Sequence, residues 1–160
     1  SYSPSAFYGI KTVEVAEENE KFRVEDNILY EGSKLVLIGN ENTGEFVVPS
    51  QVSEVCAYAG VYSQLSSIVL PSSVKRIGNH AFYGAESLRK AVISEGTEEI
   101  RRSAFSKCIM LEEVVIPQTV KSIGVQAFSG CSSLRTVTIS RDCEIGEGAF
   151  DAGVKVEYYD

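Results

Sequence analysis

The sequence lacks the residue patterns that most metal sites and many catalytic sites require. It has a single histidine, His80, and its cysteines (Cys56, Cys108, Cys131 and Cys143) include no Cys-x-x-Cys pair. Zinc sites combine cysteine and histidine ligands at short, regular spacings, so we expect no metal and no cofactor. His80 lies at a variable position, where we expect it to be solvated, and nothing marks a third group to orient it for catalysis. The sequence therefore predicts a protein that is not an enzyme.

Long apolar runs and a surplus of basic residues are also missing. No run of about 18 apolar residues occurs, so no membrane span is expected. With 15 lysines and arginines against 22 acidic residues, the net charge is −7. This charge argues against a nucleic-acid partner, which attracts a basic surface. The chain has neither an initiator methionine nor a signal-like start, so we expect a piece of a longer protein whose targeting segment has been removed.

What the sequence has in abundance is repetition. Leu65, Leu88, Leu111 and Leu134 recur every 23 residues, and each opens the pattern Leu-x-x-(Val/Ile/Ala)-x-(Ile/Leu). The alternation and the β-branched residues predict a short strand in each repeat. A second short extended piece follows, and then Ile-Gly-x-x-Ala-Phe, whose glycine suits a turn. A fixed period in the twenties is typical of a solenoid, in which each rung buries its apolar face against its neighbours.

Two sets of repeated residues predict how the rungs pack. Phe82, Phe105, Phe128 and Phe150 recur at one position and should stack as an aromatic spine. Cys108 and Cys131 share another position, where the preceding rung has Ala85, as expected for a small buried slot. Adjacent rungs lie about 4.8 Å apart, close enough for a disulfide. Stacked side chains point in parallel, however, which is poor bridge geometry and favours free thiols.

The ends of the chain depart from the repeat. At 160 residues one domain is expected. It should begin with a truncated rung (1–21), in which Ala6-Phe7-Tyr8-Gly9 repeats Ala81-Phe82-Tyr83-Gly84, and continue with a β-hairpin insert (22–40), which has one strand from Phe22 to Tyr30 and Gly32 in its turn. A half-rung (41–54), four rungs (55–144) of which the first lacks its phenylalanine, and a closing rung (145–160) whose final strand begins at Val154 should follow.

The frame Ile-Gly-x-x-Ala-Phe-x-Gly-Cys-x-x-Leu-x-x-Val-x-Ile-Pro resembles the BspA-type leucine-rich repeat of bacterial and some protist surface proteins. The resemblance implies a mainly β, right-handed leucine-rich-repeat solenoid of about 23-residue rungs, with short turns or helical segments and the hairpin insert. It also implies a secreted or cell-surface protein that adheres to host matrix proteins or to other cells, and it supplies no catalytic residues. Arg101 and Arg102 depart from the frame, which puts the local turn geometry in question.

The residues between the apolar anchors indicate where a partner would bind. Val69, Val92, Val115 and Thr138 should form a column on the solvent side of the sheet, and a contiguous apolar patch can mark a binding surface. Valine also simply favours strands, so this column need not be functional. Charges alternate in sign between rungs and should pair with one another. The candidate protein-binding face is Val69, Lys90, Val92, Glu113, Val115, Thr136 and Thr138.

Two functions remain open at this point. The first is a monomeric binding module that presents this face to a protein partner. The second is a spacer that holds another part of a larger surface protein away from the cell, with no ligand of its own.

Overall fold

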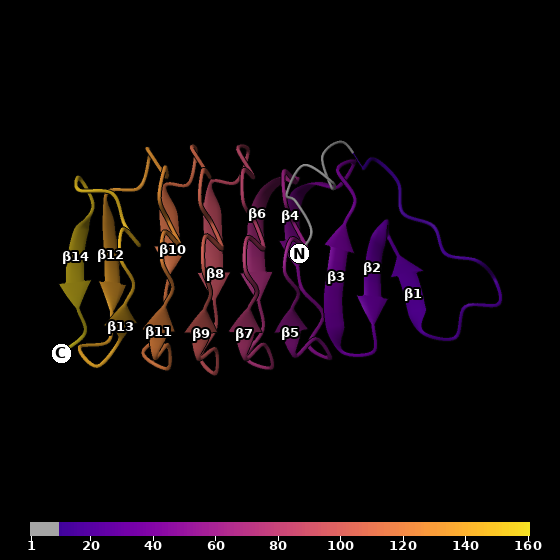
Figure 1. Cartoon of the computed structure of the whole chain (residues 1–160), viewed down its shortest axis with the longest axis horizontal. Coiled ribbons are helices and arrows are strands. Elements are labelled where there is room, and N and C mark those ends of the chain that lie inside the picture. Colours follow the sequence, from indigo (N-terminus) through magenta and orange to yellow (C-terminus); the bar gives the residue numbers. More distant parts are fainter. Residues whose placement is uncertain (1–9) are drawn as a thin grey trace.

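The computed structural model describes residues 10–160 as an all-β solenoid (Figure 1). The predicted solenoid is confirmed, but the described residues contain turns and no helix, so the expected short helical segments are wrong. The match between Ala6–Gly9 and later rungs lies outside the described residues. From β3 onward every strand pair is parallel, because each rung brings the chain back in the same direction.

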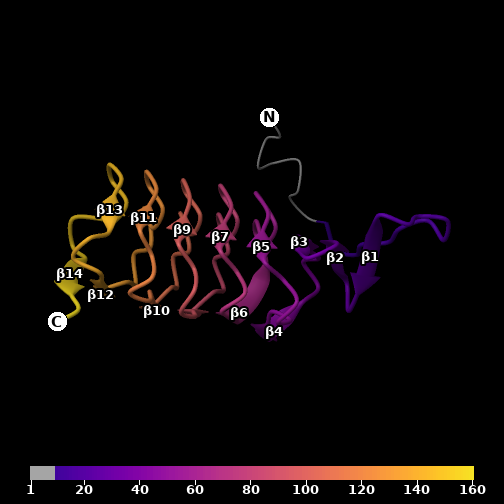
Figure 2. The same cartoon turned by 90° about the horizontal axis from the view of Figure 1, so that it is seen from below.

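The strands form two layers with the core between them, as the view from below shows (Figure 2). The first layer is an eight-stranded sheet in the order β1 (Phe22–Glu25), β2 (Ile28–Glu31), β3 (Lys34–Ile38), β5 (Glu54–Val55), β7 (Arg76–Ile77), β9 (Glu99–Ile100), β11 (Ser122–Ile123) and β13 (Glu144–Ile145). The second layer holds a four-stranded sheet of β4 (Thr43–Val47), β6 (Gln64–Leu70), β8 (Lys90–Ile93) and β10 (Glu113–Val115), and a two-stranded sheet of β12 (Thr136–Ile139) and β14 (Lys155–Tyr158).

The insert near the N-terminus extends the eight-stranded sheet. Strands β2 and β3 form the predicted hairpin, with Gly32 at φ +56° in its turn. The single strand expected from Phe22 to Tyr30 is instead two antiparallel strands, β1 and β2. The chain reverses at Asp26 and Asn27, whose φ values are +48° and +62°. A two-residue turn with both residues left-handed matches the twist of a hairpin, and Asp and Asn tolerate that conformation.

The aromatic spine is confirmed. The ring centroids of Phe82, Phe105, Phe128 and Phe150 are 5.1, 5.2 and 5.2 Å apart in succession, with interplanar angles of 17°, 3° and 8°. The spine ends at Gly60, which stands where the first rung lacks its phenylalanine. A Cβ atom there would lie 2.5 Å from the ring of Phe82. The Phe82 ring therefore packs against the backbone of Gly60, where any side chain would clash with it.

The glycine of the Ile-Gly-x-x-Ala-Phe pattern has a different role from the one expected. Gly78 and Gly124 do not have a positive φ. A Cβ atom on Gly124 would instead lie 2.5 Å from the backbone nitrogen of Arg102, and one on Gly78 would lie 2.5 Å from that of Ala57. These glycines are needed because the backbones of adjacent rungs meet there, and the left-handed residues come two positions later.

The cysteines are free thiols, as predicted, and Cys108 and Cys131 are buried. The Sγ atom of Cys108 donates to the carbonyl oxygen of Phe82 at 3.1 Å, and Cys131 donates to Phe105 at the same distance. Each thiol therefore satisfies a backbone carbonyl of the preceding rung, a bond that Ala85 at the same repeat position cannot make.

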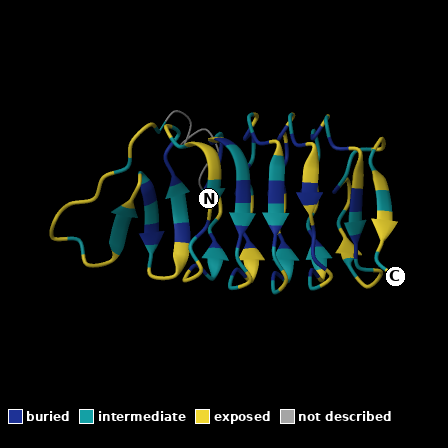
Figure 3. Cartoon of the chain, turned by 180° about the vertical axis from the view of Figure 1, so that it is seen from behind, coloured by how far each residue is buried: buried dark blue, intermediate teal, exposed yellow. Residues whose placement is uncertain are grey.

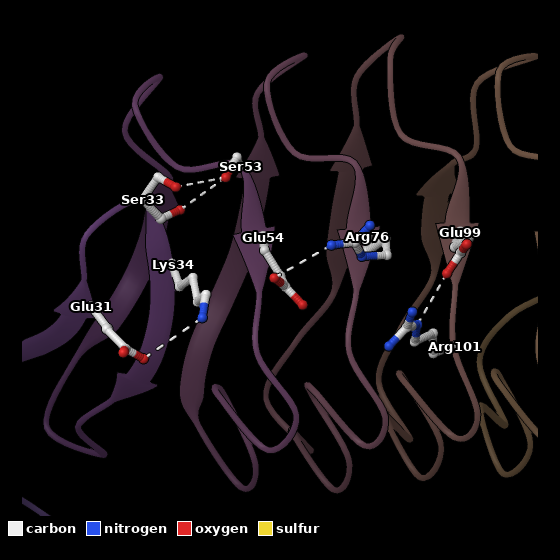
Figure 4. A network of polar contacts seen from close by, with 8 residues as sticks. All are labelled: Glu31, Ser33, Lys34, Ser53, Glu54, Arg76, Glu99 and Arg101. Atoms are coloured by element: carbon white, nitrogen blue, oxygen red, sulfur yellow. Dashed lines mark hydrogen bonds and ion pairs between the residues drawn. The ribbon is translucent and has the colours of Figure 1, made fainter.

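Charges on the eight-stranded sheet pair along the solenoid axis. Lys34, Glu54, Arg76 and Glu99 lie opposite one another in register, with alternating sign. Glu54 pairs with Arg76 of the next rung at 3.6 Å, whereas Glu99 pairs with Arg101 of its own rung at 3.1 Å (Figure 4). These groups are largely exposed, so each pair contributes at most about 1 kcal/mol. Their mutual pairing leaves no strip of one sign on this face.

Candidate protein-binding face

The outer surface of the four-stranded sheet carries two parallel rows of side chains. Strand pairing brings Val47, Val69, Val92 and Val115 into register across β4, β6, β8 and β10. We call these residues the valine row. Beside it, two positions earlier in each strand, lies the polar row of Glu45, Ser67, Lys90 and Glu113. The period-2 alternation of the strands produces both rows, because their inward neighbours fill the core.

Exposure along the valine row is uneven. Val47 and Val115 are 59% and 39% exposed, whereas Val69 and Val92 are half-buried. Figure 3, coloured by burial, shows buried and more exposed residues within the same strands. The two middle valines have a valine neighbour on each side, which covers part of their surface. The two outer valines have such a neighbour on one side only.

The polar row and the residues next to it are internally paired. Lys90 Nζ lies 2.8 Å from Glu113 Oε1, and Arg89 pairs with Glu112 at 2.9 Å. The Ser67 hydroxyl lies 3.2 Å from a carboxylate oxygen of Glu45. The predicted pairing of charges between rungs is confirmed here. Because these groups satisfy one another, the apolar row is the part of the face that lacks a complement.

The structure separates the last two predicted residues from the others. Thr136 and Thr138 lie on β12, which pairs with β14 and not with β10. Their register partners are Lys155 and Glu157. Val114 beneath this interruption is 8% exposed, whereas Ala91 at the same position of β8 is fully buried. The valine row and Lys90 and Glu113 therefore form one continuous surface, and the threonines lie beyond a break in the backbone ladder.

Two features of this face were not anticipated. Val47, the most exposed member of the row, extends it by one strand. The signal was present, since Phe46-Val-Val-Pro49 matches Val114-Val-Ile-Pro117. Pro49 lies two residues after Val47 and Pro71 two residues after Val69, and both prolines are half-buried.

His80 is not solvated as expected. Its ring stacks on Tyr58, with centroids 5.2 Å apart, and lies 5.7 Å from the Tyr83 ring. Burial and the charge of Arg102 lower the pKa of His80 below its ordinary value. Across residues 10–160, no three histidine, cysteine or acidic side chains gather in a way that could hold a metal ion. In the same range, no helix has the length and hydropathy of a membrane span.

Comparison with known proteins identifies the repeat. Residues 53–159 match the BspA type leucine-rich repeat region, in six copies. The chain belongs to the BspA-type leucine-rich repeat family. This leucine-rich repeat family is generally non-enzymatic. No curated protein gives a significant match to the chain.

Solved structures of bacterial repeat proteins resemble this BspA-type chain. A leucine-rich cell surface protein from Faecalibacterium prausnitzii is 28% identical, with a TM-score of 0.83 over 89% of this chain and 41% of that protein. A leucine-rich repeat protein of T. pallidum is 33% identical, with a TM-score of 0.69 over 86% of this chain and 66% of that one. The pneumococcal vaccine antigen PcpA is 23% identical and shares the fold, with a TM-score of 0.79 over 94% of this chain and 40% of that protein. The chain thus spans less than half of two of these relatives.

Proposed function

We propose that this chain is a non-catalytic binding module of a cell-surface protein, and that it adheres to host matrix proteins or to proteins of neighbouring cells through the valine row. The observation that carries the proposal is the contiguous apolar row, exposed at both ends, on the sheet face whose charges are already paired. The cell-surface description of the Faecalibacterium relative supports the location.

The arrangement of the face has the features of a protein contact. Protein interfaces combine an apolar centre with a polar rim, and charged residues are depleted at the centre. Here Val92 and Val115 supply the apolar centre, and the paired Lys90 and Glu113 supply one rim. Paired charges at a rim contribute mainly to specificity and to the rate of association. The net charge of −7 disfavours nucleic acid as a partner.

The proposal is tested by replacing two valines with a charge pair. Val92 and Val115 lie opposite each other, so Val92→Lys with Val115→Glu reproduces on the valine row the pair that Lys90 and Glu113 form beside it. We expect the fold to tolerate this change, since neither valine belongs to the core. Fibronectin and fibrinogen are immobilised, and binding of the wild type and the double variant is titrated. We expect binding by the wild type and loss of binding by the variant.

A matched control exchanges charges on the opposite face. Arg76→Glu with Glu99→Lys also leaves the net charge unchanged, and these residues lie on the outer face of the eight-stranded sheet. This variant should bind as the wild type does. Equal binding by the valine double variant would contradict the proposed site.

A spacer without a ligand is the second candidate function. Its support is the half-burial of Val69 and Val92 and the mutual pairing of the surface charges, which leave little of the face unsatisfied. Failure of the wild-type chain to bind any candidate matrix or cell-surface protein would favour the spacer over the binding module.

A further inference from the structure

A second surface of the solenoid carries a concentration of strained backbone. The turns that follow β5, β7, β9 and β11 form what we call the ridge (residues 56–62, 78–84, 101–107 and 124–130). Non-glycine residues of the ridge have φ between +53° and +64°: Tyr58, Tyr62, His80, Ser103, Lys107 and Gln126. Left-handed conformations are uncommon for such residues, and they concentrate at functional sites. Six such residues in four successive turns mark the ridge as a candidate functional surface.

A cavity of about 280 Å³ opens on the ridge. Its volume is just below the range of roughly 300–1,000 Å³ that is typical of small-molecule sites. Side chains from three successive rungs line it, among them Tyr83, Arg102, Ser103, Ser106, Lys107 and Gln126. Ser103 and Ser106 are buried, whereas Arg102, Lys107 and Gln126 are exposed, so the wall combines buried hydroxyl groups with exposed cationic and amide side chains.

Two cations at this cavity have no acidic partner among the described residues, although the chain has a net negative charge. Neither Arg102 nor Lys107 forms a salt bridge with any residue in the range 10–160, whereas the adjacent Arg101 pairs with Glu99. The ammonium group of Lys107 lies 5.4 Å from the centre of the Tyr83 ring. A hydrogen bond with Tyr83 raises the pKa of Lys107, so this group stays charged at neutral pH.

The remaining ionisable groups at the cavity do not cancel this charge. His80 has a lowered pKa and is mostly neutral at neutral pH. The carboxylate of Asp151 accepts hydrogen bonds from the backbone nitrogen of Gly130 at 3.0 and 3.1 Å. It is therefore already partnered, and Asp151 is not among the residues that line the cavity. The cavity thus keeps a net positive charge.

We propose that the ridge cavity binds an acidic sugar residue, such as the uronic acid of a glycan. Its carboxylate would contact Arg102 and Lys107, because charge-assisted hydrogen bonds to a carboxylate are among the strongest that a site can offer. Its hydroxyl groups would pair with Ser103, Ser106 and Gln126, which can each donate and accept. The hydroxyl and amide groups of this wall can each donate and accept, which matches the hydroxyl groups of a sugar, whereas the phosphate of a phosphorylated peptide can only accept. The site is independent of the valine row.

The test is a titration of the 15N-labelled chain, followed by amide chemical shifts, with a hyaluronan hexasaccharide, which alternates uronic acid and amino sugar. We expect saturable shifts at Ser103, Ser106 and Lys107. Arg102→Ala should weaken binding at least tenfold. Arg101→Ala removes the same charge from a neighbouring residue that is engaged with Glu99, and it should bind as the wild type does.

Several results would contradict the proposed site. A neutral chitin hexasaccharide that binds as tightly as hyaluronan would overturn the role of the carboxylate. Binding of a phosphoserine peptide or inorganic phosphate without binding of hyaluronan would overturn the sugar. An equal loss in Arg101→Ala and Arg102→Ala would show general electrostatic attraction in place of a site. The Val92→Lys, Val115→Glu variant should bind hyaluronan unchanged, which separates this site from the protein-binding face.

Discussion

The hydroxyl group of Tyr159 donates a hydrogen bond to the backbone carbonyl of Ile116, with 2.8 Å between the two oxygens and 43 residues between them in the chain. This contact crosses the interruption between β10 and β12, where the backbone ladder of the second layer stops. Regular rungs satisfy such carbonyls with backbone N–H groups, as the bond from Ser94 to Leu70 illustrates. A side chain near the end of the chain thus replaces a missing ladder bond.

Replacing Tyr159 with phenylalanine should destabilise the last rungs. The change keeps the ring and removes the hydroxyl, which leaves the carbonyl of Ile116 without this donor. We expect a loss of about 0.5–1.5 kcal/mol in the free energy of unfolding, measured by urea titration, and faster amide exchange in β12 and β14. Tyr158→Phe is the control, since Tyr158 is 45% exposed. Equal effects of the two changes would show that the bond to Ile116 is unimportant.

The aromatic spine predicts a large and local cost for Phe128→Ala. Phe128 is fully buried and stacks at 5.2 Å on both Phe105 and Phe150. Removing its ring should cost about 3–5 kcal/mol. Because rungs contact only their neighbours, amide protection should fall most in the rungs on either side. Val125→Ala, at an exposed position of the same rung, should change stability little. Uniform loss of protection from β3 to β14 would contradict local coupling.

The four thiols should differ sharply in reactivity. Burial, and next the neighbouring thiol of Cys131, raise the pKa of Cys108 well above its ordinary value. Alkylation of the native chain at about pH 8 should therefore modify the half-buried Cys56 and Cys143 and leave Cys108 and Cys131 intact until the chain is unfolded. Reductant should leave the melting temperature unchanged. A Cys108–Cys131 bridge in non-reduced peptide mass spectra would refute both expectations.

His80 should make stability depend on pH in the mildly acidic range. Burial and Arg102 depress its pKa in the folded chain below the ordinary 6.5. A depressed histidine pKa means that the unfolded chain binds the proton more readily than the folded chain. The contribution of neutral His80 to the free energy of unfolding is therefore present above about pH 6.5 and is lost as the pH falls through the pKa of the folded chain. The wild type should therefore lose stability relative to His80→Gln as the pH falls below about 6.5, measured by urea titration at several pH values. An NMR titration of His80 should show its pKa rising in Arg102→Ala; a pKa of 6.5 or above in the wild type would contradict the argument.

The repeated parts of the fold were predictable from the sequence, and the unrepeated parts were not. Phe105 and Phe128 occupy one position of a fixed period, so their stacking follows from the period alone. The turn at Asp26 and Asn27 occurs once, and it lies in a stretch of mixed polar and apolar residues (22–30) that also suits a single strand. The break between β10 and β12 has no counterpart in the spacing, because Val115 and Thr138 keep the regular period of 23 residues.

The candidate face shows the same division. The register of Val69, Val92 and Val115 followed from the repeat. Their exposure did not, because it depends on which neighbours flank each valine. His80 was misjudged for a related reason: its aromatic neighbours Tyr58 and Tyr83 come from different rungs, and a sequence period does not show which side chains of the ridge lean together.

The interruption in the second layer also gives the solenoid a mechanical weak point. Strands β11 and β13 remain paired across it through Ser122 with Glu144 and Ile123 with Ile145, while β10 and β12 do not pair. A pull along the long axis would therefore load one edge of this junction far more than the other. The junction should open as a hinge about the eight-stranded sheet, so that under tension the C-terminal rung tilts before any other rung separates.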